Sequence, residues 1–213
     1  MNYAKVINSL KRTLHNGTAL ASQAENPFRV LIATMLSHRT RDEKTEEATD
    51  ALFKHYATPK SLAQAPEAEI RALIKPVGFY RVKAKRVKNA ARILLKQFNG
   101  KVPHKMEELL SIPGVGRKTA DCVLVYAFRI PAIPVDTHVH RISNRLGWVK
   151  TKKPEETEHE LEKIIPRRFW IVLNELLVQF GQQICKPIRP NCRGCPISLE
   201  CNYYKTVFVK TKE

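Results

Sequence analysis

One stretch decides the fold of this sequence: Leu110-Ser111-Ile112-Pro113-Gly114-Val115-Gly116-Arg117-Lys118-Thr119-Ala120-Asp121. Proline fixes φ and glycine tolerates positive φ, so Pro113, Gly114 and Gly116 predict a tight turn. Apolar residues then recur at helical spacing as far as Phe128, which predicts a helix that begins after Gly116. The turn would present backbone N–H groups beside the positive end of that helix, an arrangement that suits a phosphate group.

Lys118 lies in the first turn of this predicted helix. The helix dipole disfavours a cation at that end, and the neighbouring Arg117 adds a like charge. Both effects favour the neutral amine, so a nucleophilic lysine is one interpretation. A lysine that only contacts phosphate is the other interpretation, and these residues taken alone slightly favour it.

A second stretch, Val135-Asp136-Thr137-His138, shifts the balance towards catalysis. The predicted helix is roughly 18 Å long at ~1.5 Å per residue, and the proline-stiffened segment 129–134 can extend about 20 Å. If that segment runs back along the helix, Asp136 returns to the level of Lys118, and a carboxylate and an amine face one phosphate-binding turn. Asp136 is also a suitable N-cap for a helix over residues 137–145, and the two roles are compatible.

The charge of the chain points to a polyanionic partner. Its 213 residues include 37 lysines and arginines against 20 acidic residues, a formal net charge of +17, and the apolar share of 43% supports a packed core. No basic amphipathic helix with bulky anchors stands out, so nucleic acid is favoured over a membrane surface. No apolar run approaches the roughly 20 residues that span a bilayer, and residues 1–5 lead into no signal-type core. The sequence therefore predicts a soluble, intracellular protein.

Apolar periodicity predicts an almost wholly helical chain. The segment Pro27–Leu36 is apolar on nearly all sides, which predicts a central buried helix. A long helix is expected after residue 80, ended by Asn99-Gly100, and its outer face is predicted to carry Lys83, Lys85, Arg86, Lys88 and Arg92. Only Thr206–Val209 at the tail is strand-like, which is too little for a sheet.

Four of the five cysteines give the spacing C-x6-C-x2-C-x5-C: Cys185, Cys192, Cys195 and Cys201. The odd total, with four of the five crowded near one end, argues against a secreted disulfide framework. Four thiolates in one loop-rich segment predict a metal site, and the spacing alone leaves structural zinc and an iron–sulfur cluster both open. Cys122 lies outside the pattern and is predicted to be a small buried apolar residue.

The turn Pro113-Gly114-Val115-Gly116 resembles a helix-hairpin-helix DNA-binding turn. With Lys118, the stretch around Asp136 and the four cysteines, the chain resembles the endonuclease III family of DNA repair glycosylase/lyases over nearly its whole length. The resemblance implies an all-α fold of two helical lobes with a DNA-binding cleft between them. Residues 22–133 would form a barrel-like domain with the helix-hairpin-helix, and residues 1–21 plus 134–213 a domain that holds a 4Fe–4S cluster on the four cysteines.

The same resemblance implies a bifunctional DNA glycosylase/AP lyase of base excision repair that removes oxidised pyrimidines such as thymine glycol. Lys118 would attack the sugar C1′ and form a Schiff base, and β-elimination would then nick the strand. Asp136 would stabilise the positive charge that develops on the sugar and assist proton transfer. The implied partner is double-stranded DNA with a damaged base or an abasic site, bound by a monomer in the cytoplasm of a prokaryote, on the nucleoid.

Two loop residues are implied to fill the gap left by an extruded base. The family position that is usually glutamine is Arg39 here, and the one that is usually leucine is Phe79. The longer, charged arginine leaves the preferred opposite base open, and phenylalanine could still wedge by stacking. The predicted DNA contacts are Arg39, Phe79, Pro113, Gly114, Val115, Gly116, Arg117, His138, His140, Lys186, Arg189 and Arg193. The alternatives are ordinary surface residues for the loop positions and a structural role for each histidine.

Two other functions remain open at the level of sequence. A related mismatch glycosylase would remove thymine or uracil opposite guanine, but members of that group often lack the lysine. A noncatalytic helix-hairpin-helix DNA-binding protein with a structural metal would explain the charge, the turn and the cysteines. It gives no reason for Lys118 together with Asp136.

Overall fold

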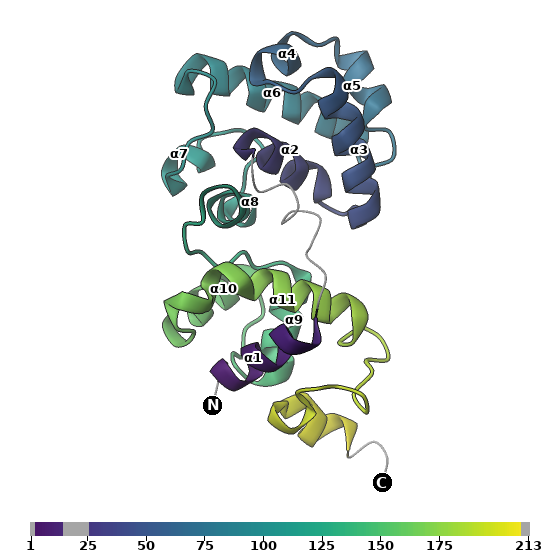
Figure 1. Ribbon diagram of the computed structural model, residues 1–213, viewed down its shortest axis with the longest axis vertical. Helices are drawn as coiled ribbons and strands as arrows, with labels where there is room; N and C mark the ends of the chain where they lie inside the picture. The colour runs from purple at the N-terminus through teal and green to yellow at the C-terminus, as the bar shows by residue number, and fades with distance from the viewer. Residues whose placement is uncertain (1–2, 15–25, 210–213) are drawn as a thin grey trace. The chain divides into compact units, whose positions relative to one another are not determined.

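The computed structural model describes residues 3–14 and 26–209, and every regular element in these ranges is a helix (Figure 1). The predicted all-α fold class is thereby confirmed. The described residues form two compact units, residues 26–130 and residues 3–14 with 131–209. One boundary of the predicted domains, between residues 21 and 22, lies outside the described residues, so that division stays a prediction. None of the described helices is long and apolar enough to cross a lipid bilayer.

The unit of residues 26–130 is built around α2 (Pro27–Ser37). Eight of its 11 residues are buried because it is apolar on nearly all sides, so the predicted central helix is confirmed. It packs against α3 (Asp42–His55), α6 (Tyr80–Phe98), α8 (Arg117–Cys122) and the π-helical turn η2 (Val123–Ala127). The unit also contains α4 (Pro59–Gln64), α5 (Glu67–Leu73) and α7 (Met106–Leu110).

Local sequence signals fix where these helices begin and end. Asn26 is the N-cap of α2, and its side-chain oxygen accepts hydrogen bonds from the N–H groups of the second and third helical residues. Pro27 supplies the fixed φ of the first position. Thr58 and Ser61 form a capping box at the start of α4. At the end of α6, Asn99 has a φ of 51° in the left-handed region, as is common just past a helix.

The basic face of α6 differs from the prediction at one residue. Lys85, Arg86 and Arg92 are exposed as expected and Lys88 is half-buried, but Lys83 is only 5% exposed. The expectation that Lys83 lies on the outer face is wrong, because its side chain reaches the end of α2. There its ammonium donates hydrogen bonds to three oxygen atoms.

The second unit contains α1 (Tyr3–Thr13), α9 (Thr137–Leu146), α10 (Pro154–Ile164) and α11 (Trp170–Gln183). Three short turns complete it: η3 (Arg167–Phe169), η4 (Ser198–Glu200) and η5 (Tyr204–Phe208). α11 packs against α9 and α1, and the apolar faces of all three helices join one continuous core. α10 also packs against α9.

The tail is helical and not a strand. Thr206 lies in the π-helical turn η5, where Val209 N donates to Tyr204 O at 3.1 Å and the rings of Tyr204 and Phe208 stack with centroids 5.5 Å apart. The composition of Thr206–Val209 is strand-like, but the run is too short for a sheet, as predicted, and an isolated strand would have no neighbour to satisfy its backbone groups. A local helical turn satisfies them within the segment.

Candidate functional site

The predicted tight turn is confirmed between α7 and α8. Val115 N donates to Ile112 O at 3.0 Å, which closes the turn, and both side chains are buried and anchor it. Gly114 has a φ of 92°, and a Cβ there would lie 3.3 Å from Cδ of Arg86. Glycine therefore fits this position both in conformation and in space. The exposed residues of the turn are Pro113, Gly114, Gly116 and Arg117.

α8 begins directly after the turn, with Gly116 as its N-cap, and continues into η2, which confirms the helix predicted after Gly116. No side chain caps this helix end. The first N–H groups of a helix have no partners within the helix, so this end is suited to an anion. Arg117 and Lys118 occupy the first two helical positions and add positive charge to it.

Lys118 is half-buried and lies near His38, a residue that sequence patterns did not single out. His38 comes from the end of α2, and its Nε2 lies 3.2 Å from the hydroxyl oxygen of Thr119. Partial burial of the imidazole and the positive charges of Lys118, Lys83 and Arg86 lower the pKa of His38 to about 4. The ring is therefore neutral at neutral pH and can exchange hydrogen bonds beside the candidate nucleophile.

Asp136 caps α9, as predicted. Its Oδ1 accepts hydrogen bonds from the N–H groups of the second and third residues of α9, at 2.9 and 2.8 Å. The cap thus occupies one carboxylate oxygen and leaves Oδ2 outside it. Just before the cap, Asn174 Nδ2 donates to Pro134 O at 2.7 Å and fixes the chain. Lys118 belongs to one unit and Asp136 to the other, and their meeting at one pocket stays a prediction.

The four clustered cysteines line one pocket of their unit, together with apolar side chains that include Ile142, Leu146, Phe180 and Ile197. All four are free thiols, and no three His, Cys, Asp or Glu side chains in residues 3–14 and 26–209 are placed to hold a single metal ion. Burial raises the pKa of Cys195 to about 11 and also raises the pKa of Cys192 and Cys201. These thiols keep their protons at neutral pH until a bound group displaces them. Cys122 lies apart from the pocket and is buried on α8, as predicted.

Comparison with known proteins gives the family. The sequence profile of the HhH-GPD superfamily of base excision DNA repair proteins matches residues 32–167. Endonuclease III from Thermotoga maritima is 53% identical over 180 residues, which cover 84% of this chain and 84% of that protein. The chain belongs to the endonuclease III family.

Two solved structures of DNA repair enzymes are similar over almost the whole chain. A trapped endonuclease III–DNA covalent intermediate, an estranged-adenine complex, matches with a TM-score of 0.84 and 34% identity, over 97% of this chain and 95% of that one. A thermostable thymine-DNA glycosylase matches with a TM-score of 0.82 and 26% identity, over 95% and 94% of the two chains. This endonuclease III family member is a DNA-binding enzyme of base excision repair, a DNA glycosylase and AP lyase, and that prediction is confirmed. A noncatalytic DNA-binding module is excluded.

In this endonuclease III family member, Arg145 binds the first cysteine loop, residues 185–192. From the last turn of α9 its guanidinium donates to Cys185 Sγ at 3.3 Å, to Lys186 O at 2.7 Å and to Pro187 O at 2.8 Å. Cys201 Sγ in turn donates to Arg145 O at 3.4 Å. Sequence reasoning missed Arg145, because its partners lie at least 40 residues further along the chain.

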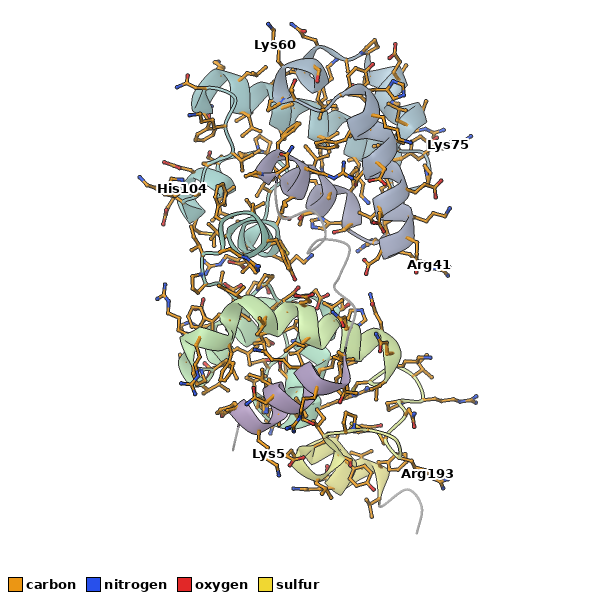
Figure 2. All side chains as sticks on the ribbon, in the orientation of Figure 1. Lys5, Arg41, Lys60, Lys75, His104 and Arg193 are labelled. Atoms are coloured by element: carbon orange, nitrogen blue, oxygen red, sulfur yellow. The ribbon has the colours of Figure 1, made fainter. Side chains whose placement is uncertain are left out.

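The outer side of the cysteine loops is basic. Lys186, Arg189 and Arg193 are exposed, and Ile188 between them is 79% exposed. Arg193 projects from the edge of this unit (Figure 2). Exposure leaves these side chains accessible to DNA, and their contact with it stays a prediction.

The two histidines after Asp136 have partners inside their own unit. His138 Nδ1 lies 3.1 Å from Nη2 of Arg141, and His140 Nδ1 lies 2.6 Å from the hydroxyl oxygen of Thr157. These contacts support the structural alternative for both residues. Their contact with DNA stays a prediction.

The two predicted gap-filling residues lie at helix ends in one unit. Arg39 follows α2 and Phe79 is the N-cap of α6, with φ values of 52° and 58°. Both are exposed, Phe79 to 62%, and Cζ of Arg39 lies 5.8 Å from the centre of the Phe79 ring. Together they line an open hollow of about 270 Å³, whose wall includes Met35, Val82 and Arg86. Packing thus brings the two residues together, although the insertion of either into DNA stays a prediction.

The neutral state of His38 gives a test of the geometry around Lys118. We expect the His38 ring to titrate near pH 4 in an NMR experiment, and Lys118→Gln to raise that pKa because one of its nearby charges is removed. Since the unfolded chain binds this proton near pH 6.5, the free energy of unfolding should decrease as pH falls from about 6.5 towards 4. Lys96→Gln also removes one lysine charge, at a residue of α6 that lies about 20 Å along the helix from Lys83, and should leave the titration unchanged. If Lys118→Gln left the pKa of His38 unchanged, as Lys96→Gln should, this geometry would be contradicted.

Proposed function

We propose that this enzyme excises oxidised pyrimidines such as thymine glycol and nicks the strand, with Lys118 as the nucleophile and Asp136 as the charge-stabilising carboxylate. The observation that carries the proposal is the position of Lys118 in the first turn of α8, directly after the exposed, uncapped turn. A DNA phosphate bound by the N–H groups of that turn would bring the adjoining sugar towards the lysine. The covalent endonuclease III–DNA intermediate among the similar structures supports covalent chemistry of this kind.

The proposed base excision and strand cleavage need Lys118 as the nucleophile and water to release it. The neutral amine of Lys118 attacks C1′, the bond from C1′ to the base breaks, and the base leaves with the electron pair and takes up a proton. The amine loses a proton, and opening of the sugar ring gives a Schiff base at C1′. The Schiff base acidifies C2′, so loss of a proton from C2′ expels the phosphate at C3′ and cuts the strand. Water then releases Lys118.

Asp136 fits the charge that develops in this reaction. As the bond to the base breaks, the sugar becomes positive, and a fixed carboxylate stabilises it without having to reorganise. One oxygen of Asp136 is fixed by the N–H groups of α9, so the other has a defined direction. We propose that Lys118 and Asp136 face one cleft that takes the damaged nucleotide.

The net charge of +17 supplies sequence-independent affinity for DNA, which should decrease steeply with salt. The damaged base must leave the helix to react, at a cost of a few kcal/mol that is smallest for damaged or mismatched pairs. We propose that Arg39 and Phe79 fill the space it vacates. We also propose that the enzyme acts as a monomer on chromosomal DNA in the cytoplasm.

We propose that the cysteine pocket holds a 4Fe–4S cluster. Four thiols face one pocket with an apolar lining, yet no three such ligands among the described residues are placed around a single ion, as tetrahedral zinc requires. A group larger than one ion, with four thiolate ligands, suits both facts. Cys185, Cys192, Cys195 and Cys201 would hold it, and it would supply a link between the tail and the core of this unit, with no part in bond cleavage.

A thymine or uracil mismatch glycosylase is the second candidate, favoured by the similarity to a thymine-DNA glycosylase. The lysine at the start of α8 favours the lyase instead. A panel of duplexes with oxidised pyrimidines, uracil or thymine opposite guanine separates the two. We expect the oxidised pyrimidines to be cut fastest, with strand cleavage that accompanies base release.

Lys118→Ala tests the nucleophile. Borohydride should trap wild-type enzyme covalently on DNA with an abasic site, and the variant should form no adduct, because no amine remains to form the Schiff base. Binding of the same DNA should weaken by no more than about tenfold, since one positive charge is lost. Lys96→Ala is the control for that charge and should still be trapped. An adduct that survives Lys118→Ala would assign the chemistry to another amine.

Asp136→Asn separates the charge of this residue from its cap. Asparagine caps a helix about as well as aspartate, so the melting temperature should stay close to that of the wild type. The single-turnover rate of base release should nevertheless decrease by about 10²- to 10³-fold, because the developing positive charge loses its carboxylate. A near-normal rate would remove Asp136 from the chemistry.

Metal analysis tests the cluster. The purified protein should be brown, with broad visible absorbance and about four irons per chain, and Cys192→Ser should reduce the iron content. Cys122→Ala, at the cysteine outside the pocket, should keep the iron. A colourless protein that contains one zinc would overturn the assignment.

A further inference from the structure

Lys83 is a buried ammonium that the reaction does not use. Its side chain is 5% exposed, and Nζ donates hydrogen bonds to Leu36 O at 2.6 Å, His38 O at 2.7 Å and Thr40 Oγ1 at 2.9 Å. Within the part of the chain that the structure describes, none of these partners is a carboxylate. Burial lowers the pKa of Lys83 to about 8, which leaves it mostly charged at neutral pH.

The ammonium lies where α2 ends. The last carbonyls of a helix lack partners within it and form the negative end of its dipole, so a cation is favoured there. Helices often use a glycine in the left-handed region to finish such an end. Here the left-handed residue is Arg39, with a φ of 52°, and Lys83 binds the carbonyls from another helix.

The same contacts reach the second loop. Thr40 Oγ1, a partner of Lys83, also accepts a hydrogen bond from Gly78 N at 3.1 Å. A Cβ at Gly78 would lie 2.9 Å from Arg39 O, so only glycine allows this approach of the two backbones. Phe79 follows with a φ of 58° and lies under the Arg39 guanidinium.

We propose that Lys83 is a positioning residue that joins the loops 37–41 and 76–79, so that Arg39 and Phe79 meet the DNA as one preformed wedge. This inference rests on the proposed function, in which those two residues fill the gap left by the base. A non-glycine residue in the left-handed region is held there only by its surroundings. A wedge ordered before DNA binds does not have to be ordered while the base is extruded.

Packing alone does not explain why the buried side chain at position 83 carries an ammonium group. An apolar side chain of similar length would fill the volume without the desolvation of a charge. Lysine offers three donors from one atom, and here they bind one carbonyl of the last turn of α2 and a carbonyl and a hydroxyl of the loop that carries Arg39. The hydrogen bonds that an apolar residue would lose are those that fix the loop.

The test uses the full chain and Lys83→Met, which keeps the length of the side chain and removes its donors. Excision of a damaged base from duplex DNA should slow by about 10- to 100-fold, because a small misplacement of the wedge is costly. Cleavage of an abasic site in single-stranded DNA should stay within about threefold of wild type, because that substrate has no gap to fill. Lys96→Met, exposed on the same helix, is the control for lost charge.

A second measurement, which does not depend on catalysis, accompanies the excision and cleavage rates. Hydrogen exchange of the Gly78 amide, which is bound to Thr40 Oγ1, should speed up in Lys83→Met and stay unchanged in Lys96→Met. If Lys83→Met unfolds or loses both activities equally, Thr40→Val decides, since it breaks the bridge between the loops and leaves Lys83 its two carbonyls. A selective loss of duplex excision in that variant supports the wedge.

The proposal is overturned if Lys83→Met matches wild type on duplex DNA, or if Thr40→Val changes duplex excision and single-strand cleavage alike. Failure of the proposed function gives a different result, since wild-type enzyme would then release no damaged base from duplex DNA. The exchange of the Gly78 amide still reports on the link between the loops in that case.

Discussion

The first N–H groups and the last C=O groups of an α-helix have no partners within the helix. In this protein the proposed site residues lie at or next to such helix ends. The start of α8 has no side-chain cap and carries Lys118. The start of α9 is capped by Asp136, which leaves one carboxylate oxygen outside the cap. The end of α2 is bound by the ammonium of Lys83. In each case the helix end, with or without a side chain that satisfies it, lies beside a residue that we propose acts on DNA.

Residues with an unusual backbone conformation also lie in the predicted DNA-binding loops. Five non-glycine residues in the described part of the chain have positive φ, and three of them carry predicted DNA contacts: Arg39, Phe79 and Arg189. Such conformations persist only where the surrounding contacts determine them. For Arg39 and Phe79 those contacts are visible, in the buried ammonium and in the close approach of Gly78. The two side chains that we propose enter DNA thus extend from backbone that packing holds in place.

Features encoded within a few residues could be predicted from the sequence. The turn at Gly114, the helix after it and the cap at Asp136 depend on neighbours in the chain, and each was found where expected. Lys83 and Arg145 depend on partners more than 39 residues away, and on sequence alone each belongs to an ordinary basic helix face. Periodicity assigns a helical residue to a face, but it does not show which other helix end that face meets. Lys83 was therefore placed in solvent although it is buried.

α9 shows how the cysteine loops can matter to a reaction in which they take no part. Asp136 caps its first turn, and Arg145, nine residues later and about 13 Å along the helix, donates to the first cysteine loop. α9 is further covered by α11 and α10, which restrict its rotation. A group that binds Cys185 and Cys201 would fix the loop that Arg145 contacts, and so the helix end opposite the carboxylate. The cysteine pocket and the Asp136 carboxylate are then joined by one helix, so a group bound by the cysteines would hold the proposed catalytic carboxylate in place without itself reacting.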